Sequence, residues 1–467
     1  MNHLRDPIYN SNRAGKRRSA LFLTLWMLAV ADGAFGFQGK AFGPESYRAR
    51  TDQRVEAYPS APPSLGPAGS VINDPSFGSR IVRVTDPKAD PLGKGRLFAT
   101  PSSAEQNPWN SNSTKFYVST AGGQYVVYEF EPSSMSVHQR DVMRVGWGGE
   151  PQFSYTRPDV VYGIRGRDAA FQEYQISARK VTTIHTISDC IKSETPGHSI
   201  TVSADDERMS TSVGPQQDEN YIVYVYDRKQ GCRWYNTETG EIGGQWGPKG
   251  QIDIPDRYRI HNQRLSKSGK YIWIQRGRNF AGKHWLVWEV GTMKVVACAS
   301  QCTGHRAIGY SQMIGPSGFV HPLDLIERPL DHLENVKHLI PGLQPLHGAQ
   351  FWYDSHLSWN NADPEDSRPV CLSTYLGSNP KSPGIAPSVF HAWDNEIVCV
   401  ETAGKDPKVW RFAHTYSTAK NGFWSTPRGN VSPDGRFFMF TSDWQDQLGQ
   451  TPSGKDYRTD VFIVELK

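Results

Sequence analysis

Four histidines stand at corresponding points of a repeated pattern, each just ahead of a short apolar segment: His198, His261, His305 and His356. His198 precedes Ser203 by five residues, and His261 precedes Ser266 by the same interval. Imidazoles gathered in one place suit two kinds of chemistry, because neutral imidazole binds divalent metals and also exchanges protons near neutral pH. A structural hydrogen bond to a neighbouring strand is the alternative for each histidine taken singly.

An arginine and two amides occupy the same point in other copies of the pattern: Arg428, Asn107 and Gln152. The lyase resemblance described below implies elimination next to a carboxylate, and this set is compatible with that reaction. The reaction removes a weakly acidic proton, so the site must neutralise the carboxylate with a metal or an arginine and must offer a base.

The residues divide into candidate roles for such a reaction. We expect Arg428 or Arg306 to clamp the carboxylate, His261 or His198 to act as the base, and Tyr310 to protonate the leaving oxygen. Arg306 and Tyr310 adjoin an inner strand, so packing between neighbouring units is an equally good reading of both.

Aromatic residues lie close to the starts of the repeated units, where ring faces can stack on sugars: Trp109, Trp147, Trp352, Trp359 and Trp424. Trp359 and Trp424 are the substrate-binding candidates, together with Arg306 and with His347 on a loop. Packing in the core or at the rim is the alternative for these tryptophans.

The element that positions these residues is a unit of about 45 to 70 residues, repeated about seven times from near Phe77. The last copy, Val431–Phe440, contains Ser-Pro-Asp-Gly-Arg between two apolar strands, and Leu265–Ile274 follows the same frame. The Pro-Asp-Gly sequence predicts a tight turn between two strands.

The Ser-Pro-Asp-Gly-Arg frame resembles the propeller repeats of the TolB-like family, also called WD40-like repeats. The resemblance implies an all-β fold, a β-propeller of about seven blades with four antiparallel strands each. We expect the strand at Ser79–Val84 and the strand at Asp460–Leu466 to close the ring. The histidines would then meet where the inner strands begin; a pair of β-sandwiches or a solenoid is the alternative.

Histidine-rich channel mouths also resemble those of the oligogalacturonate lyases and, more loosely, the ulvan lyases. That likeness implies a divalent metal, such as Mn, Ca or Zn, held by His305, Gln350 and His356, with His261 as the catalytic histidine. The chain departs from the lyase pattern, because Gln350 and His356 stand six residues apart without a second close histidine.

The N-terminal residues have the pattern of an export signal, with Lys16–Arg18 ahead of an apolar run over Ala20–Ala31. We expect residues 1–36 to be this signal, 37–76 to be a linker or leader, and 77–467 to be the propeller. An uncleaved membrane anchor is the alternative for the first segment. The prediction is therefore a secreted or periplasmic protein without a membrane span after cleavage.

The net charge bears on whether the chain binds nucleic acid, and the cysteine content bears on disulfide bonds. Removing residues 1–36, which hold five basic and two acidic residues, changes the net charge from +4 to +1, and this disfavours nucleic acid. The six cysteines can form disulfides in an exported chain, and Cys298 and Cys302 are the close pair. The predicted state is a monomer.

Two functions fit these observations. The first is a carbon–oxygen lyase that cleaves uronic-acid glycans by β-elimination and so binds an acidic oligo- or polysaccharide. The second is a non-catalytic TolB-like propeller that binds a protein or glycan partner.

Overall fold

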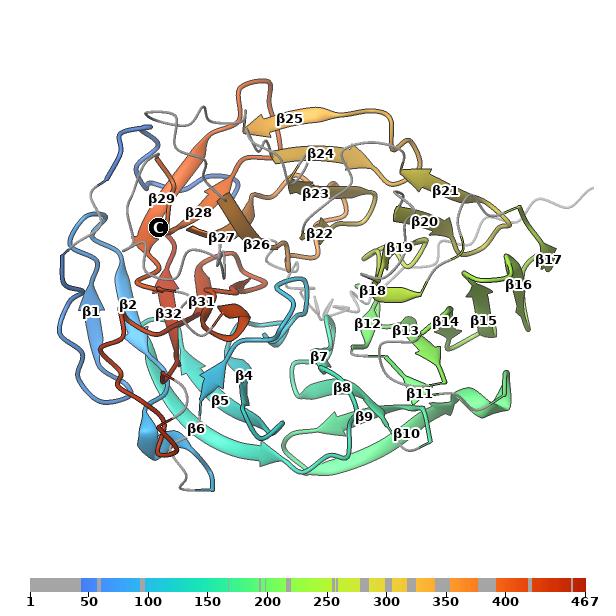
Figure 1. Ribbon diagram of the computed structural model, residues 1–467, viewed down its shortest axis with the longest axis horizontal. Helices are drawn as coiled ribbons and strands as arrows, with labels where there is room; N and C mark the ends of the chain where they lie inside the picture. Colours follow the sequence, from blue (N-terminus) through green and yellow to red (C-terminus); the bar gives the residue numbers. More distant parts are fainter. Residues whose placement is uncertain are drawn as a thin grey trace, which may run out of the picture. The chain divides into compact units, whose positions relative to one another are not determined.

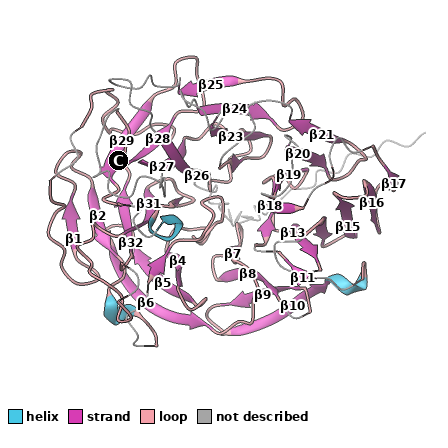
Figure 2. Ribbon diagram, viewed as in Figure 1, coloured by secondary structure: helices cyan, strands magenta, loops and turns pink. Residues whose placement is uncertain are grey.

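Short strands separated by turns make up nearly all of the regular structure (Figure 2). The computed structural model describes residues 43–56, 60–92, 97–166, 168–192, 195–197, 199–215, 220–253, 257, 259–277, 285–298, 305–316, 325–340, 353–376, 392–418, 422–454 and 457–467. Short 3-10 helices are η1 (Pro87–Ala89), η2 (Ile187–Asp189) and η4 (Gly422–Ser425). In the described residues no helix has the length and apolar character needed to cross a bilayer.

Seven antiparallel sheets surround a common axis, so the prediction of an all-β propeller of about seven blades is confirmed (Figure 1). From the axis outward, blade 1 consists of β3 (Phe98–Ala99), β4 (Lys115–Thr120), β5 (Tyr125–Glu131) and β6 (Ser136–Met143), and blade 2 of β7 (Gln152–Phe153), β8 (Val160–Arg165), β9 (Ala170–Gln175) and β10 (Lys180–Thr186). Blade 3 begins with β11 (Thr195–Pro196) and β12 (Thr201–Val202), which both pair with β13 (Arg208–Gly214). It continues with β14 (Ile222–Asp227), β15 (Gly231–Asn236), β16 (Glu241–Gly244) and β17 (Gly250–Gln251).

Blades 4 to 6 have four strands each. They are β18 (Ile260–Leu265), β19 (Tyr271–Arg276), β20 (Trp285–Glu289) and β21 (Val295–Cys298); β22 (Ala307–Ile308), β23 (Gln312–Pro316), β24 (Leu325–Pro329) and β25 (Lys337–Ile340); and β26 (Tyr353–Ser358), β27 (Val370–Leu376), β28 (Glu396–Val400) and β29 (Val409–His414).

Blade 7 joins the two ends of the propeller. Its strands are β30 (Asn430–Val431), β31 (Phe437–Ser442), β32 (Asp460–Glu465), β2 (Arg80–Arg83) and β1 (Val71–Asn73). Strand β2 pairs with β32, as expected, and Arg80 forms an ion pair with Glu465 at 2.8 Å. Because β1 belongs to this sheet, the blade begins within the segment expected to be a leader.

The hydrophobic core lies between neighbouring blades. One cluster, for example, combines Val223 and Val225 of β14 with Ile272 and Ile274 of β19. A blade packed on both faces has strands that are buried throughout, and all six residues of β32 are buried. Outer strands such as β10 are instead exposed over several consecutive residues.

The repeated Ser-x-x-Gly frame has a stereochemical basis. In five turns of the described chain that lie between the two innermost strands of a blade, the residue three positions after a Ser, Asn or Asp has a φ between 51° and 69°; the pairs are Asn110 and Ser113, Ser203 and Asp206, Ser266 and Gly269, Asp363 and Asp366, and Ser432 and Gly435. The first side chain accepts hydrogen bonds from the far side of the turn, as Ser432 Oγ does from Phe437 N at 3.1 Å. A left-handed residue suits Gly, Asp and Asn, which explains the composition of the frame.

Asp206 also ties blade 3 to blade 2. Its carboxylate accepts hydrogen bonds from Ser154 Oγ at 2.6 Å, Tyr155 N at 3.1 Å and Thr156 N at 3.2 Å. Asp366 does the same between blades 6 and 5, with donors that include Tyr310 N at 2.8 Å. These two aspartates therefore connect neighbouring blades.

Replacing Asp206 with Ala should lower the free energy of unfolding by about 2–4 kcal/mol, because buried donors lose their acceptor and Ala tolerates the left-handed turn poorly. Asp206→Gly removes only the second cost, so its loss should be smaller by about 1 kcal/mol. Urea unfolding measures both. The exposed neighbour Asp205→Ala is the control, and a loss in that variant as large as in Asp206→Ala would contradict the inter-blade role.

Two disulfides lie within the described chain. Cys190 pairs with Cys232 across blades 2 and 3, and Cys371 pairs with Cys399 across β27 and β28. Cys298 is also disulfide-bonded, whereas Cys302 lies outside the described residues. Residues 1–36 lie outside them as well, so the export signal stays a prediction.

Candidate functional site

The inner strands divide the predicted site residues between two ends of the axis. At one end, which we call the histidine end, lie Glu150, His305 and Arg428, which precede inner strands, His261 near the start of β18, and His356 within β26. At the other end, which we call the lysine end after the buried Lys267, lie residues near the ends of these strands or after them. Tyr155, Ala204 and Ala362 form one apolar cluster there with Tyr310. The distance between the two ends differs from blade to blade, because the inner strand β18 has six residues whereas β7 and β22 have two.

His305 and His356 form the centre of the histidine end. Their rings are stacked, with centroids 4.0 Å apart and an interplanar angle of 24°. His305 Nδ1 donates to Ser355 O at 3.1 Å, and the hydroxyl of Tyr375 lies 3.3 Å from His356 Nε2. His356 is only 1% exposed, and its Nδ1 has no hydrogen-bond partner in the described structure. Burial, helped by the charges of His305 and Arg428, holds the pKa of His356 well below its usual value, so the ring is neutral.

Arg428 supplies a positive charge beside this pair. The side chain is fully buried, and its Nη1 donates to Phe423 O. Its Nε and Nη2 have no hydrogen-bond partner in the described residues. Burial lowers the pKa of Arg428 to about 10, which leaves it charged at neutral pH. An unpaired guanidinium edge matches a carboxylate, which accepts two parallel hydrogen bonds.

Two exposed aromatic residues cover Arg428. Phe423 and Trp424 lie on η4 and are 41% and 58% exposed. The Arg428 Cζ atom is 4.4 Å from the Phe423 ring centroid and 5.3 Å from that of Trp424. Phe423 also contacts His356, at 6.1 Å between ring centroids. Ring faces of this kind can stack on a sugar.

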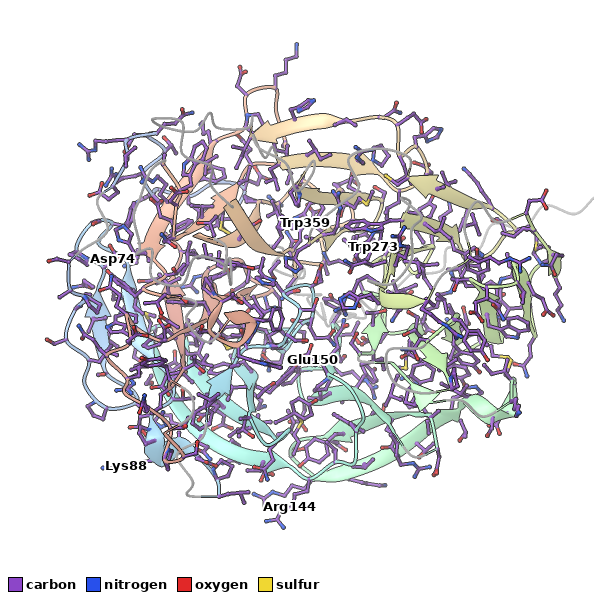
Figure 3. The ribbon with its side chains drawn as sticks, in the orientation of Figure 1. Asp74, Lys88, Arg144, Glu150, Trp273 and Trp359 are labelled. Carbon is purple, nitrogen blue, oxygen red and sulfur yellow. A yellow bond between two sulfur atoms is a disulfide. The ribbon has the colours of Figure 1, made fainter. Side chains whose placement is uncertain are left out.

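Glu150 was not predicted from the sequence. It lies two residues before β7, and Ser102 N donates to its Oε1. Burial raises the pKa of Glu150, against the opposing fields of Arg264 and Arg428. Its position at the start of an inner strand, in register with the histidines, was the available signal. Figure 3 shows Glu150 and Trp359 close to the centre of the ring.

A non-repeated segment, residues 100–107, crosses the axis between the two ends. The Gln106 amide donates to Pro151 O at 2.7 Å and to Ile200 O at 3.0 Å. Asn430 Nδ2 donates to Ala104 O at 2.8 Å, so blade 7 also holds the segment. The histidine end and the lysine end are therefore separate places, a feature that no repeat in the sequence indicates.

The remaining predicted residues fall into four groups. The Tyr310 hydroxyl donates to Ala362 O at 3.1 Å and Trp359 Nε1 donates to Arg368 O at 2.7 Å, which places both at the lysine end, away from His305. Arg306 is buried with its guanidinium 5.0 Å from the Trp285 ring centroid, a packing position between blades 4 and 5. His261 is exposed at the start of β18. The fourth group lies outside the described residues: His198, His347, Gln350 and Trp352.

The stacked histidines do not fit a shared metal ion as they are placed. An ion binds each imidazole in the plane of the ring, about 2.0–2.1 Å from a nitrogen. Rings 4.0 Å apart and tilted by 24° have in-plane directions that do not converge over such a distance. Among the described residues, no three His, Cys, Asp or Glu side chains form a group that could hold a metal.

His356→Phe should flatten the acid limb of the stability profile. An imidazole with a lowered pKa binds fewer protons when folded than when unfolded, so its stabilising effect is complete above about pH 6.5 and is lost as the pH falls. As the pH falls below about 6.5 the wild type should therefore lose more stability than the variant. Urea unfolding at several pH values measures the difference, and equal slopes would show that His356 titrates normally.

Comparison with known proteins shows the fold. No protein-family model and no curated protein matches the chain in sequence. A solved oligogalacturonate lyase in complex with manganese has a TM-score of 0.52 and 10% identity, covering 87% of this chain and 98% of that one. An oligogalacturonate lyase from Vibrio parahaemolyticus has a TM-score of 0.45 and 10% identity, covering 85% of this chain and 96% of that one. TolB from Acinetobacter baumannii has a TM-score of 0.34 and 12% identity, covering 59% of this chain and 63% of that one.

Proposed function

We propose that the chain is a polysaccharide lyase that cleaves a uronic-acid glycan by β-elimination at the histidine end. The observation that carries the proposal is the unpaired guanidinium edge of Arg428, which lies beside the neutral imidazole of His356 and against two exposed aromatic rings. One place thereby offers a group that binds a carboxylate, a proton acceptor and a surface on which a sugar ring can stack.

The reaction proceeds without an external oxidant or reductant. A base takes the proton from the carbon that bears the carboxylate, the electron pair forms a carbon–carbon double bond, and the bond to the glycosidic oxygen breaks. That oxygen leaves with a proton, which it takes from the protonated base or from water. Arg428 neutralises the carboxylate, which makes the proton more acidic and stabilises the developing negative charge.

An imidazole is the base in this proposal. His261 keeps that role because it is exposed at the start of β18 and can meet a substrate without rearrangement. The buried His356 holds the His305 ring in place through the stacked contact between the two rings. Tyr310 is dropped from the mechanism because its hydroxyl lies at the lysine end. The metal set of His305, Gln350 and His356 stays a separate hypothesis, since Gln350 lies outside the described residues.

The test is ultraviolet absorbance of the unsaturated uronate product, with the purified mature chain on a panel of acidic polysaccharides and oligosaccharides. Three conditions are compared: added Mn²⁺, added Ca²⁺ and excess EDTA. A rise with EDTA present supports elimination that relies on Arg428, and a rise only with metal supports the metal hypothesis. No rise on any substrate would overturn the lyase proposal.

A non-catalytic propeller that binds a protein or glycan is the second candidate. The observation that favours it is the burial of His356, together with exposed Phe423 and Trp424, which form a contact surface without needing any chemistry. Binding of an acidic glycan without product formation, lost on Trp424→Ala, would support this function instead.

Secretion or a periplasmic location belongs to the same proposal. The support is the pair of disulfides, Cys190–Cys232 and Cys371–Cys399, because such bonds persist in oxidising compartments.

A further inference from the structure

The lysine end contains a small pocket of its own, on the far side of residues 100–107 from the histidines. Six blades or connecting segments contribute to it, and the lining residues are Glu105, Gln152, Tyr155, Thr201, Val202, Arg264, Leu265, Lys267, Ala307, Ile308, Trp359 and Asn360. The free space is about 30 Å³. That is room for about two water molecules, or for one small ion.

Lys267 is a buried cation in this pocket. It is 5% exposed, its Nζ donates to Trp359 O, and the ammonium lies 5.3 Å from the centroid of the Trp359 ring. Burial lowers the pKa of Lys267 to about 8, against the fields of Asp366 and Asp363. Those two carboxylates are already engaged by backbone amides of their own turns and of blade 5. The ammonium therefore has a neutral carbonyl as its hydrogen-bond acceptor.

Arg264 is the second buried cation, on the same inner strand. It is 3% exposed, and its Nη1 donates to Gln106 Oε1 at 2.6 Å. Its Nε has no hydrogen-bond partner in the described structure. Within the described residues neither cation forms an ion pair, although the field of Arg264 acts on Glu150 and the fields of Asp366 and Asp363 act on Lys267. Two buried cations without paired counter-charges are costly for a folded chain.

One lining residue is acidic, and its oxygens are already used. Glu105 accepts a hydrogen bond from Arg306 N at 3.0 Å through Oε1 and from Ser103 Oγ through Oε2. The pocket thus contains two cationic side chains, Lys267 and Arg264, and the Nε–H of Arg264 has no hydrogen-bond partner in the described structure. The carboxylate of Glu105 is hydrogen-bonded to other groups.

We propose that this pocket binds a small monoanion of the size of chloride, between Lys267 and the Nε of Arg264. The anion supplies a counter-charge where, among the described residues, no carboxylate forms an ion pair with either cation, and the free space of about 30 Å³ matches one small ion. The site is independent of the proposed lyase function, because residues 100–107 separate it from the histidine end.

Thermal unfolding of the mature chain in sodium chloride and in sodium gluconate, at equal ionic strength, tests the proposal. A ligand that binds the folded state raises the Tm with its concentration, so the wild type should become more stable with added chloride but not with bulky gluconate. Lys267→Met should lose most of this dependence. Lys270→Met, an exposed lysine of the same turn that pairs with Glu289 at 3.3 Å, should keep it.

A crystal grown in sodium bromide provides a second measurement that does not depend on a variant. Anomalous scattering from bromide in the pocket is the expected result. Water alone in the pocket, or the same chloride dependence in wild type and Lys267→Met, would overturn the proposal. Failure of the lyase assay leaves these outcomes unchanged.

Discussion

Arg428→Met should reduce kcat/KM for uronate elimination by about 100- to 1,000-fold, the range seen when a group that stabilises developing charge is removed. The reason is the position of Arg428, whose Nε and Nη2 have no partner in the described residues and lie beside the neutral His356. The measurement is product absorbance on the substrate identified in the panel. Thermal unfolding should change little, because the variant removes a buried charge rather than leaving one without a partner.

Two further variants make this result specific. Arg428→Lys keeps the charge but cannot form two parallel hydrogen bonds, so it should recover only part of the activity. Arg436→Met removes an exposed arginine of blade 7, which lies over Phe437, and should behave as wild type. Activity in Arg428→Met equal to that of the wild type would exclude Arg428 as the clamp.

Arg411→Ala should lower the free energy of unfolding by about 3–5 kcal/mol, the cost of leaving a buried charge unpaired. Arg411 Nη2 and Nε contact the two oxygens of Glu396 at 2.5 and 2.8 Å, and both side chains are fully buried. Arg411 Nη1 also donates to Arg54 O at 2.7 Å and so holds the segment before β1 against blade 6. Urea unfolding followed by tryptophan fluorescence measures the loss.

The double variant Arg411→Met with Glu396→Met separates the ion pair from the packing. Replacing both charges with apolar side chains of similar size should recover most of the loss, since no charge then remains buried. Arg54→Ala, at an exposed ion pair with Glu56, should change stability by no more than about 0.5 kcal/mol. A small effect of Arg411→Ala, comparable to that of Arg54→Ala, would show that the Glu396 carboxyl takes up a proton instead.

The local frame of the chain was sufficient to predict the fold. A residue such as Asp206 or Gly435 in the left-handed region, three positions after a hydrogen-bonding side chain, is a requirement of the turn itself, so it recurs in the sequence. The pairing of β2 with β32 was also predictable, because a propeller of such blades needs its ends joined.

The candidate site was predicted only in part. His305, His356 and Arg428 share one position of the repeat, and the structure brings them to one end of the axis. Trp424 was likewise predicted, whereas Phe423 beside it was not. Tyr310 and Trp359 were placed with them because they adjoin inner strands, yet a strand of a few residues carries such side chains to the opposite end.

The sequence by itself therefore determined the propeller and placed His305 and His356 in corresponding repeats, because the propeller follows from hydrogen bonds and φ angles within single repeats. The tertiary structure decided the rest, because those contacts join residues far apart in the chain. Gln106 links segments of blades 2, 3 and 4, and it separates the histidine end from the pocket of Lys267 and Arg264. The counter-charge missing from that pocket is visible only when all its neighbours are in place.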